Sequence, residues 1–268
     1  MPPLLNRRLP GVTRRRFLAG GLALGVGLPA YARTVEPGWL KMRRLNLPGA
    51  GPNPARPLRF AHFTDIHFKG REERLREAVE AVNRLAPDFA CFTGDLVEDA
   101  GHVEPALRLL SGIRCPLYGV PGNHDHWADV DFDRYREMFA ATGGRWLMDE
   151  ALDLPRWNVR LLGLDNRFSP LRPEPGRFNP VLMHYPGWAR ELPWRGNLLL
   201  AGHSHGGQVR IPGYGALIEP EGTDGYDLGW FETASGPLYV NPGLGTFFLD
   251  VRLFCRPEIT VFEGGGGQ

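Results

Sequence analysis

Between residues 58 and 125, short apolar runs alternate with helical patterns, and this alternation leaves few folds open to the chain. Buried strands are predicted from three apolar, β-rich runs, "LRFAHFTD", "DFACFTGD" and "PLYGVPGN". Helices are predicted between them from "REERLREAVEAVNRLA" and "VEPALRLLSGI", the first of which repeats apolar residues at helical spacing. A β-α-β-α-β order of this kind predicts parallel strands joined by helical crossovers.

The second half of the chain has a different pattern. After a further helix predicted in "DFDRYREMFAATG", few helical patterns remain. Short strands are expected in "NVRLLGLD", "NPVLMHYP", "NLLLAGHSH", "GQVRIP", "PLYVNPG" and "EITVFE". We therefore expect a second sheet that packs against the first, with helices outside.

The N-terminal residues 1–32 have the pattern of an export signal. Arginines in "TRRRFL" precede the uncharged run "FLAGGLALGVGLPA" and the small-x-small sequence Ala30-Tyr31-Ala32, which predicts cleavage after Ala32. The adjacent arginines resemble the twin-arginine signal, which exports folded proteins and suits a metal-loaded chain. The expected location is the periplasm or cell envelope, and the export machinery is an expected partner. The alternative is an uncleaved membrane anchor, although the run is too short for a regular spanning helix.

The rest of the chain is expected to form one domain. Residues 33–57 predict an irregular lead-in because "LPGAGPNPARP" is rich in proline and glycine. The domain spans residues 58–263, and the glycine tail, residues 264–268, is expected to be disordered. Beyond the arginine-bearing first 32 residues, acidic residues slightly outnumber basic ones, so nucleic-acid binding is not expected. Three cysteines without C-x-x-C spacing argue against a complete disulfide framework, which leaves room for one bridge.

Polar residues follow the predicted strands at the points where those strands end. Ligand sites in α/β sheets gather at these carboxyl ends. Each signal is weak alone, but their occurrence together, in this order, is specific. The candidate motifs are Asp65-x-His67, Gly94-Asp95, Gly122-Asn123-His124, His184 and Gly202-His203-x-His205.

The donor atoms in these motifs are carboxylate oxygen, amide oxygen and imidazole nitrogen, without a thiolate. This mixture suits Mn²⁺, which we expect first, or Fe or Zn²⁺, and it differs from an all-oxygen Ca²⁺ cage. Six candidate ligands, together with a shared Asp95, exceed what one tetrahedral ion needs. Two divalent ions about 3.5–4 Å apart would use them all, and such a pair generates a nucleophile and neutralises phosphoryl oxygens.

The motif order D-x-H, G-D, G-N-H-D, H, G-H-x-H resembles the calcineurin-like metallophosphoesterase superfamily over residues 58 to 210. Further stretches, "GHSHGGQVRIP", "LYVNPGLGT" and "VRLFCRPEIT", resemble its bacterial branch of exported or membrane-associated phosphodiesterases and extend the match to near residue 262. The resemblance implies an α/β fold, a four-layered α-β-β-α sandwich of two mixed sheets flanked by helices.

The resemblance also implies roles for single residues. One metal would be held by Asp65, His67, Asp95 and His205. The other would be held by Asp95, Asn123, His184 and His203, so that Asp95 bridges. His124 matches the family's non-ligand histidine, which stabilises the transition state or protonates the leaving oxygen. Two carboxylates, Asp125 and Glu98, compete to orient the His124 ring.

The leading hypothesis is a two-metal phosphoesterase that hydrolyses phosphodiesters through a metal-bridging hydroxide, with His124 and Asp95 as catalytic residues; phosphomonoesters come next. A small phosphorylated substrate is expected, with a lipid-linked substrate and a membrane surface as alternatives. A second hypothesis is a pyrophosphohydrolase of a nucleotide-linked lipid A precursor of the UDP-2,3-diacylglucosamine type, against which the export signal counts. A third is a non-catalytic, metal-stabilised binding module, which would have no use for His124.

Overall fold

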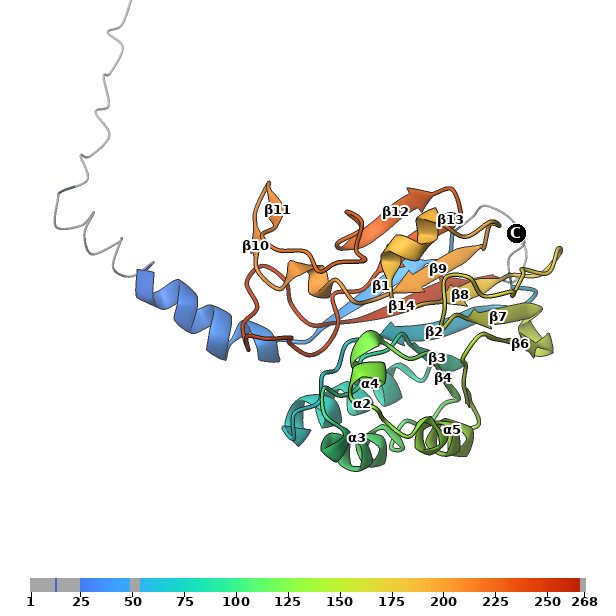
Figure 1. Cartoon of the computed structure of the whole chain (residues 1–268), viewed down its shortest axis with the longest axis horizontal. Helices are drawn as coiled ribbons and strands as arrows, with labels where there is room; N and C mark the ends of the chain where they lie inside the picture. Colours follow the sequence, from blue (N-terminus) through green and yellow to red (C-terminus); the bar gives the residue numbers. More distant parts are fainter. Residues whose placement is uncertain (1–12, 14–24, 49–53, 266–268) are drawn as a thin grey trace, which may run out of the picture.

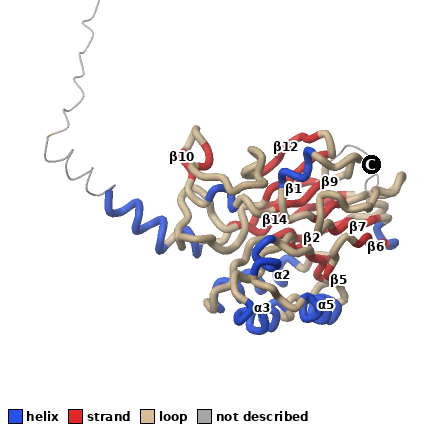
Figure 2. The backbone as a smooth tube through the Cα atoms, in the orientation of Figure 1, coloured by secondary structure: helices blue, strands red, loops and turns tan. Residues whose placement is uncertain are grey.

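The computed structural model describes residues 13, 25–48 and 54–265, which form two stacked six-stranded sheets with α-helices on one side (Figure 1). A short hairpin, β10 (Arg210–Ile211) and β11 (Gly215–Ala216), stands apart from both sheets. Figure 2 shows α2, α3 and α5 gathered along the outer face of the first sheet. The predicted α/β fold with two mixed sheets is confirmed.

The first sheet holds the predicted crossover region. Its strands β2, β3 and β4 run parallel, as the sequence predicted, and a short strand that was not predicted, β5, pairs parallel with β4. Strand β14 is antiparallel to β2, and β1 is parallel to β14. In spatial order the strands are β1 (Lys41–Asn46), β14 (Glu258–Gly264), β2 (Leu58–Phe63), β3 (Phe89–Phe92), β4 (Leu117–Gly119) and β5 (Arg145–Trp146).

Three helices connect these strands and cover one face of the sheet: α2 (Glu72–Leu85), α3 (Val103–Leu110) and α5 (Phe132–Ala141). The side chains that α2 buries recur at helical spacing, which is why this stretch forms an amphipathic helix on the sheet. Its C-cap, Ala86, adopts a left-handed conformation immediately before Pro87, which cannot continue a helix.

The second sheet is parallel in its centre and antiparallel at both edges. In spatial order its strands are β12 (Gly229–Thr233), β13 (Gly236–Val240), β9 (Leu198–Ala201), β8 (Pro180–Leu182), β7 (Val159–Gly163) and β6 (Glu150–Leu154). Among the described residues, its outer face carries the 3₁₀ helix η4 (Pro186–Arg190) and irregular segments. The fourth layer is thus thin, because Pro193 keeps the helix that begins at Pro186 from continuing.

Aromatic and aliphatic side chains fill the space between the sheets. Phe60 of β2 stacks on Phe89 and Phe262, with ring centroids 5.1 and 5.2 Å apart. These rings belong to one buried cluster with Leu161 and Leu200 of the second sheet. Burial of each such side chain contributes roughly 1.5–3 kcal/mol, so this layer holds the two sheets together.

Strand β1 corrects the expectation for residues 33–57. That segment was predicted to be irregular, yet residues 41–46 pair along their whole length with β14. Half-buried and exposed residues alternate along β1, as on an edge strand with one face toward the core. Its three basic residues, Lys41, Arg43 and Arg44, hid this pattern in the sequence. The short 3₁₀ helix η1 (Glu36–Gly38) also precedes it.

Further elements were not anticipated. The loop predicted after β4 begins as a one-turn helix, α4 (Asn123–Trp127). Two more 3₁₀ helices, η2 (Ala100–His102) and η3 (Pro155–Trp157), lie in connections, and a third, η5 (His205–Gly207), follows β9. All three cysteines are buried and free, so the disulfide left open by the sequence does not form.

The chain ends bear on the predicted export signal and glycine tail. Most of residues 1–32 lie outside the described residues, as do residues 266–268 of the tail, whereas Gly264 belongs to β14. Residues 25–34 are helical and extend away from the sheets (Figure 1). Within the described ranges, none of the helices has the length and apolar character needed to span a bilayer.

Candidate metal centre

The carboxyl ends of five strands meet at one edge of the sandwich. Strands β2, β3 and β4 come from the first sheet and β8 and β9 from the second, and each is followed by polar residues of the predicted motifs. All seven predicted metal ligands are buried there: Asp65, His67, Asp95, Asn123, His184, His203 and His205. The structure thus brings together every ligand that the sequence predicted.

The first group of ligands lies around His205. Its Nε2 atom is 3.0 Å from Nε2 of His67 and 3.4 Å from Oδ1 of Asp65. The donor atoms of these three residues all lie within 4.8 Å of one another. Such convergence of two imidazoles and a carboxylate fits a divalent transition-metal ion.

The second group lies around His184. Its Nε2 atom is 3.0 Å from Oδ1 of Asn123 and 3.2 Å from Nδ1 of His203. Oδ2 of Asp95 faces both groups, 3.2 Å from Nε2 of His184 and 3.4 Å from Nε2 of His67. Asp95 therefore occupies the position from which one carboxylate can bridge two ions.

Contacts outside the centre fix the orientation of the histidine rings. Nδ1 of His184 donates to the carbonyl of Thr93, and Nε2 of His203 donates to the carbonyl of Glu221, both at 2.7 Å. When one nitrogen of a neutral imidazole donates, the other keeps its lone pair for a metal. Each ring thus turns its other nitrogen into the centre, His184 toward Asp95 and His203 toward His184, where a neutral ring would offer its lone pair to a metal.

The charge of the centre also fits cations. Asp65 and Asp95 are buried carboxylates, a costly state without nearby positive charge. Burial lowers the pKa of His184, but Asp95 and Asp65 more than offset this and raise it to about 9. The two carboxylates therefore favour positive charge in this space, and bound divalent ions would supply it.

The backbone is strained where the ligands sit. Left-handed φ angles, uncommon for residues other than glycine, occur at five of the seven predicted ligands. These are Asp65 (50°), His67 (44°), Asp95 (59°), His203 (68°) and His205 (50°). Strain at so many adjacent positions indicates that the fold places these side chains at a cost in free energy, as functional sites do.

Two glycines of the motifs allow close approach. A Cβ atom at Gly122 would lie 2.1 Å from Oδ1 of Asp95, and one at Gly202 would lie 2.2 Å from Oδ2 of Asp65. No side chain fits at these distances. The glycine in G-N-H and the glycine in G-H-x-H are thus required by the carboxylates that they pack against.

His124 lies at the open side of the centre and is partly exposed. Its backbone N–H donates to Oδ1 of Asp95 at 2.8 Å. Its ring packs on Trp127 and Phe247, with centroids 4.8 Å apart in each case. A ring nitrogen also lies within 4.8 Å of the donor atoms of His67 and Asp95, and burial lowers the pKa of His124.

Neither carboxylate that was expected to orient His124 does so. Asp125 is buried and accepts from the backbone N–H groups of Asp95, Leu96 and Gly122, and its Oδ1 accepts from the hydroxyl of Tyr135. It fixes the loops that carry the ligands.

Glu98 instead lies beside a predicted metal ligand. Its Oε1 is 3.0 Å from Nδ1 of His67 and 2.9 Å from Nζ of Lys69. The aromatic rings of Trp127 and Phe247 position His124 in place of a carboxylate, and no motif in the sequence marked them for this role.

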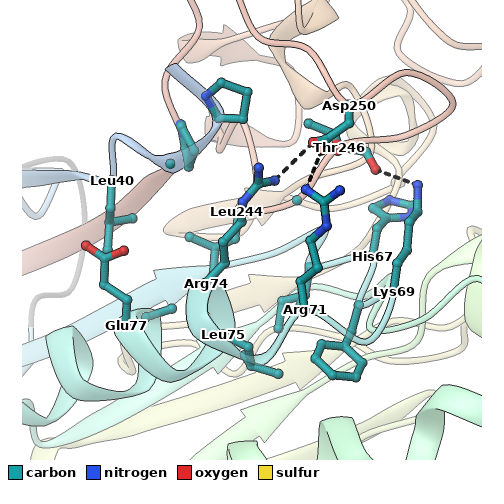
Figure 3. A pocket seen from close by; sticks show the side chains of 17 residues that line it. Leu40, His67, Lys69, Arg71, Arg74, Leu75, Glu77, Leu244, Thr246 and Asp250 are labelled. Atoms are coloured by element: carbon teal, nitrogen blue, oxygen red, sulfur yellow. Dashed lines mark hydrogen bonds and ion pairs between the residues drawn. The ribbon is translucent and has the colours of Figure 1, made fainter. Parts of the chain in front are cut away.

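A pocket of about 280 Å³ adjoins the centre at His67 (Figure 3). Arg71 and Arg74 reach across its edge to Asp250, at 2.9 and 3.1 Å, and Lys69 donates to the carbonyl of Thr246. The remaining wall is mainly apolar. Sequence reasoning missed this pocket, since its walls come from α2 and from segments near both ends of the chain.

Comparisons with known proteins agree with this geometry. A family model described as calcineurin-like phosphoesterase matches residues 58–207. The metallophosphoesterase YkuE of Bacillus subtilis, which is uncharacterized, is 30% identical and aligns with 94% of this chain and 97% of its own length. The phosphodiesterase YaeI of Escherichia coli is 27% identical, over 94% of this chain and 99% of its own length.

Proposed function

Because the chain belongs to the calcineurin-like phosphoesterase family, and is thus a metal-dependent hydrolase of phosphoric esters, we propose that it hydrolyses phosphodiesters with two divalent metal ions. The observation that carries the proposal is the position of Asp95, whose Oδ2 lies 3.2 Å from His184 and 3.4 Å from His67. One carboxylate oxygen shared by two groups of ligands is the arrangement that a binuclear site needs.

The two sites differ in their ligands. Asp65, His67 and His205 would hold one ion, and Asn123, His184 and His203 the other, with Asp95 common to both. Bound there, the ions would supply a hydroxide nucleophile at neutral pH and neutralise the charge of the phosphoryl oxygens. The nitrogen and oxygen donors favour Mn²⁺, with Fe and Zn²⁺ as alternatives.

His124 is proposed as the acid that protonates the leaving oxygen. Its ring lies beside Asp95 and His67, yet it is partly exposed and can reach a group that extends out of the centre. Packing on Trp127 and Phe247 limits its rotation. A general acid needs this combination of fixed position and access to the leaving atom.

Phosphodiesters are preferred over phosphomonoesters because the relative YaeI is named a phosphodiesterase and aligns over nearly its whole length.

The test is hydrolysis of two matched aryl substrates, a phosphate diester and a phosphate monoester, by protein reconstituted with Mn²⁺. We expect diester turnover that is lost in Asp95→Asn and kept in Asp99→Asn, a matched change at a largely exposed side chain. Faster turnover of the monoester would reassign the protein as a phosphatase. No turnover of either substrate by metal-loaded protein would contradict the proposal.

We also propose that the chain is exported in folded form. The support is the sequence pattern of residues 1–32, with paired arginines, an apolar run and a small-x-small site at Ala30-Tyr31-Ala32. Sequencing the N-terminus of protein purified from the cell envelope is expected to give Arg33. An intact N-terminus on membrane-bound protein would support the uncleaved anchor instead.

A further inference from the structure

Two loops of the metal centre run side by side beyond the ends of β2 and β3. The backbone N–H of His67 donates to the carbonyl of Asp95 at 3.0 Å, and a parallel β-bridge pairs Phe68 with Val97. Glu98 directly follows this bridge in the second loop. The paired backbones thus bring the Glu98 carboxylate to the side of the His67 ring.

The two nitrogens of the His67 ring face different groups. Nε2 faces the centre, 3.0 Å from Nε2 of His205 and 3.4 Å from Oδ2 of Asp95. Nδ1 lies on the other side of the ring, 3.0 Å from Oε1 of Glu98. The ring is fully buried, and no other group of the described residues is hydrogen-bonded to Nδ1. Glu98 is therefore the acceptor within reach of this nitrogen.

This contact distinguishes His67 from the other three predicted histidine ligands. The outer nitrogens of His184 and His203 donate to backbone carbonyls, and the outer nitrogen of His205 is buried without a hydrogen-bond partner among the described residues. A carboxylate behind a ligating imidazole fixes the ring and its tautomer and makes the metal-facing nitrogen more basic. Only the ligand group that contains His67 has such a carboxylate in the described part of the chain.

Lys69 restrains the Glu98 side chain. Its Nζ atom lies 2.9 Å from the same Oε1 atom and donates to the carbonyl of Thr246 at 3.1 Å (Figure 3). The Glu98 side chain is 27% exposed, so without this contact it is free to turn toward solvent. Contact with both His67 and Lys69 instead keeps that oxygen against the ring.

We propose that Glu98 is a positioning residue for the first metal site: it holds the His67 ring with Nε2 toward the ion, and Lys69 keeps Glu98 in place. Glu98 acts through His67 and touches neither the ion nor the substrate. The inference rests on the proposed function in one respect, because it assumes that the group of Asp65, His67 and His205 holds a metal. It makes the two sites unequal, since the second site has no counterpart of Glu98 among the described residues.

The test measures binding of Mn²⁺ to the full-length, metal-free chain by competition with a chromophoric chelator. In Glu98→Gln, which removes the charge at unchanged length, the affinity of one of the two sites should fall roughly ten- to a hundredfold. The affinity of the other site should stay within about twofold of the parent value, because its ligands do not contact Glu98.

Glu263→Gln provides the matched control. The Glu263 side chain is 33% exposed and pairs with Arg44 and Arg59 at the opposite end of β2 from Asp65. This variant should bind Mn²⁺ as the parent protein does. Urea unfolding of both metal-free variants should match the parent closely, since partly exposed ion pairs contribute little to stability.

Electron paramagnetic resonance gives a readout that does not depend on activity. At a Mn²⁺ concentration that fills both sites of the parent protein, we expect a spin-coupled pair in the parent and the signal of an isolated ion in Glu98→Gln. Glu98→Asp keeps the charge but is one methylene shorter, so it should restore part of the lost affinity.

A double-mutant cycle tests the part assigned to Lys69. If Lys69 acts by restraining Glu98, the effect of Lys69→Gln on the affinity of the first site should differ between the parent and Glu98→Gln. The same effect in both backgrounds would show that Lys69 acts only through its own charge, and would overturn its assigned role.

Two results would overturn the role of Glu98. The first is equal Mn²⁺ affinity in Glu98→Gln and Glu263→Gln. The second is equal weakening of both sites in Glu98→Gln, which would indicate a general loss of negative charge and not the positioning of one ligand. Hydrolysis of the aryl diester is scored separately. A parent protein that binds two ions without turnover would contradict the proposed function and leave this inference standing, whereas a parent that binds none would contradict both.

Discussion

The carboxylate of Asp95 faces different partners with its two oxygen atoms. Oδ1 accepts from the backbone N–H of His124, and Oδ2 faces His67 and His184. This contact ties the position of His124 to the proposed bridging ligand. A change at Asp95 should therefore disturb both the metal sites and the position of the proposed acid.

At the residue scale, the first prediction concerns His124. In His124→Ala we expect kcat for the diester to fall by roughly 10² to 10⁴, the usual contribution of a general acid. The ligand groups stay in place, so the content of bound metal should be unchanged. The measurement is steady-state hydrolysis together with elemental analysis of the purified variant.

His126 provides the matched control because it lies on the same short helix. Its Nε2 atom is 2.7 Å from Oδ1 of Asp165, and nearly half of its side chain is exposed. His126→Ala should keep nearly full activity. Equal losses in both variants would show that disturbance of α4, and not loss of the acid, lowers the rate.

The ligands could be predicted from sequence because each follows a predicted strand, and the parallel strands of each sheet end at a common edge. The partners of Asp125 could not, because its contacts to Asp95 and Leu96 join loops about 30 residues apart. Proximity in the sequence suggested that Asp125 orients His124. In the structure, the carboxylate oxygens of Asp125 accept hydrogen bonds from the backbone N–H groups of Asp95, Leu96 and Gly122 instead.

At the scale of elements, the glycines before the ligands control how closely the loops approach. Gly122 has φ −107°, which any residue can adopt, so the effect of a substitution there is steric. Gly122→Ala would place a Cβ atom 2.1 Å from Oδ1 of Asp95. We expect a loss of about 1–3 kcal/mol in the free energy of unfolding and weaker metal binding.

The measurement is urea unfolding with metal titration, and Gly38→Ala is the control. A Cβ atom at Gly38 meets nothing within 4 Å, so that variant should match the parent protein in both readouts. Parental metal affinity in Gly122→Ala would show that the loop between β4 and α4 can move away from Asp95 without consequence.

Elements with a strong local pattern were predictable, and elements defined by distant partners were not. Helix α2 repeats buried residues at helical spacing and was predicted. Strand β1 pairs with β14, which lies more than 200 residues later in the chain. The alternation along β1 is too weak to indicate a strand without that partner.

At the scale of the whole molecule, the layer between the sheets contains a histidine that is not part of the proposed centre. His62 of β2 is fully buried, and its Nε2 lies 2.9 Å from the hydroxyl of Thr93. Burial lowers its pKa from 6.5 to about 3, although Asp65 opposes this shift. The folded protein therefore keeps His62 neutral in mildly acidic solution.

This pKa predicts a pH dependence of stability. Between pH 6.5 and 3 the unfolded chain binds a proton at His62 that the folded protein does not, so stability falls as the pH falls. From pH 7 to 5 this group should remove about 2 kcal/mol of unfolding free energy. Urea unfolding with a chelator present measures this effect. Between pH 7 and 5, we expect the free energy of unfolding of His62→Gln to fall by about 2 kcal/mol less than that of the parent protein.

Chelator removes the pH dependence that comes from metal binding, so the comparison isolates His62. Identical slopes in the parent protein and in His62→Gln would contradict the assigned burial of a neutral ring.

The arrangement of the whole molecule could be predicted only in part. The sequence indicated two sheets with their strand ends together, because the motifs of both halves needed a common site. The order within the first sheet could not be predicted, since the last strand, β14, is inserted between β1 and β2.

The most direct test of the binuclear centre is the number of metal ions bound per chain. Isothermal titration of metal-free protein with Mn²⁺, checked by elemental analysis, should give about two ions per chain, and Asp95→Asn should retain fewer. One ion or none in the folded parent protein would contradict the central claim that both groups of ligands hold a metal.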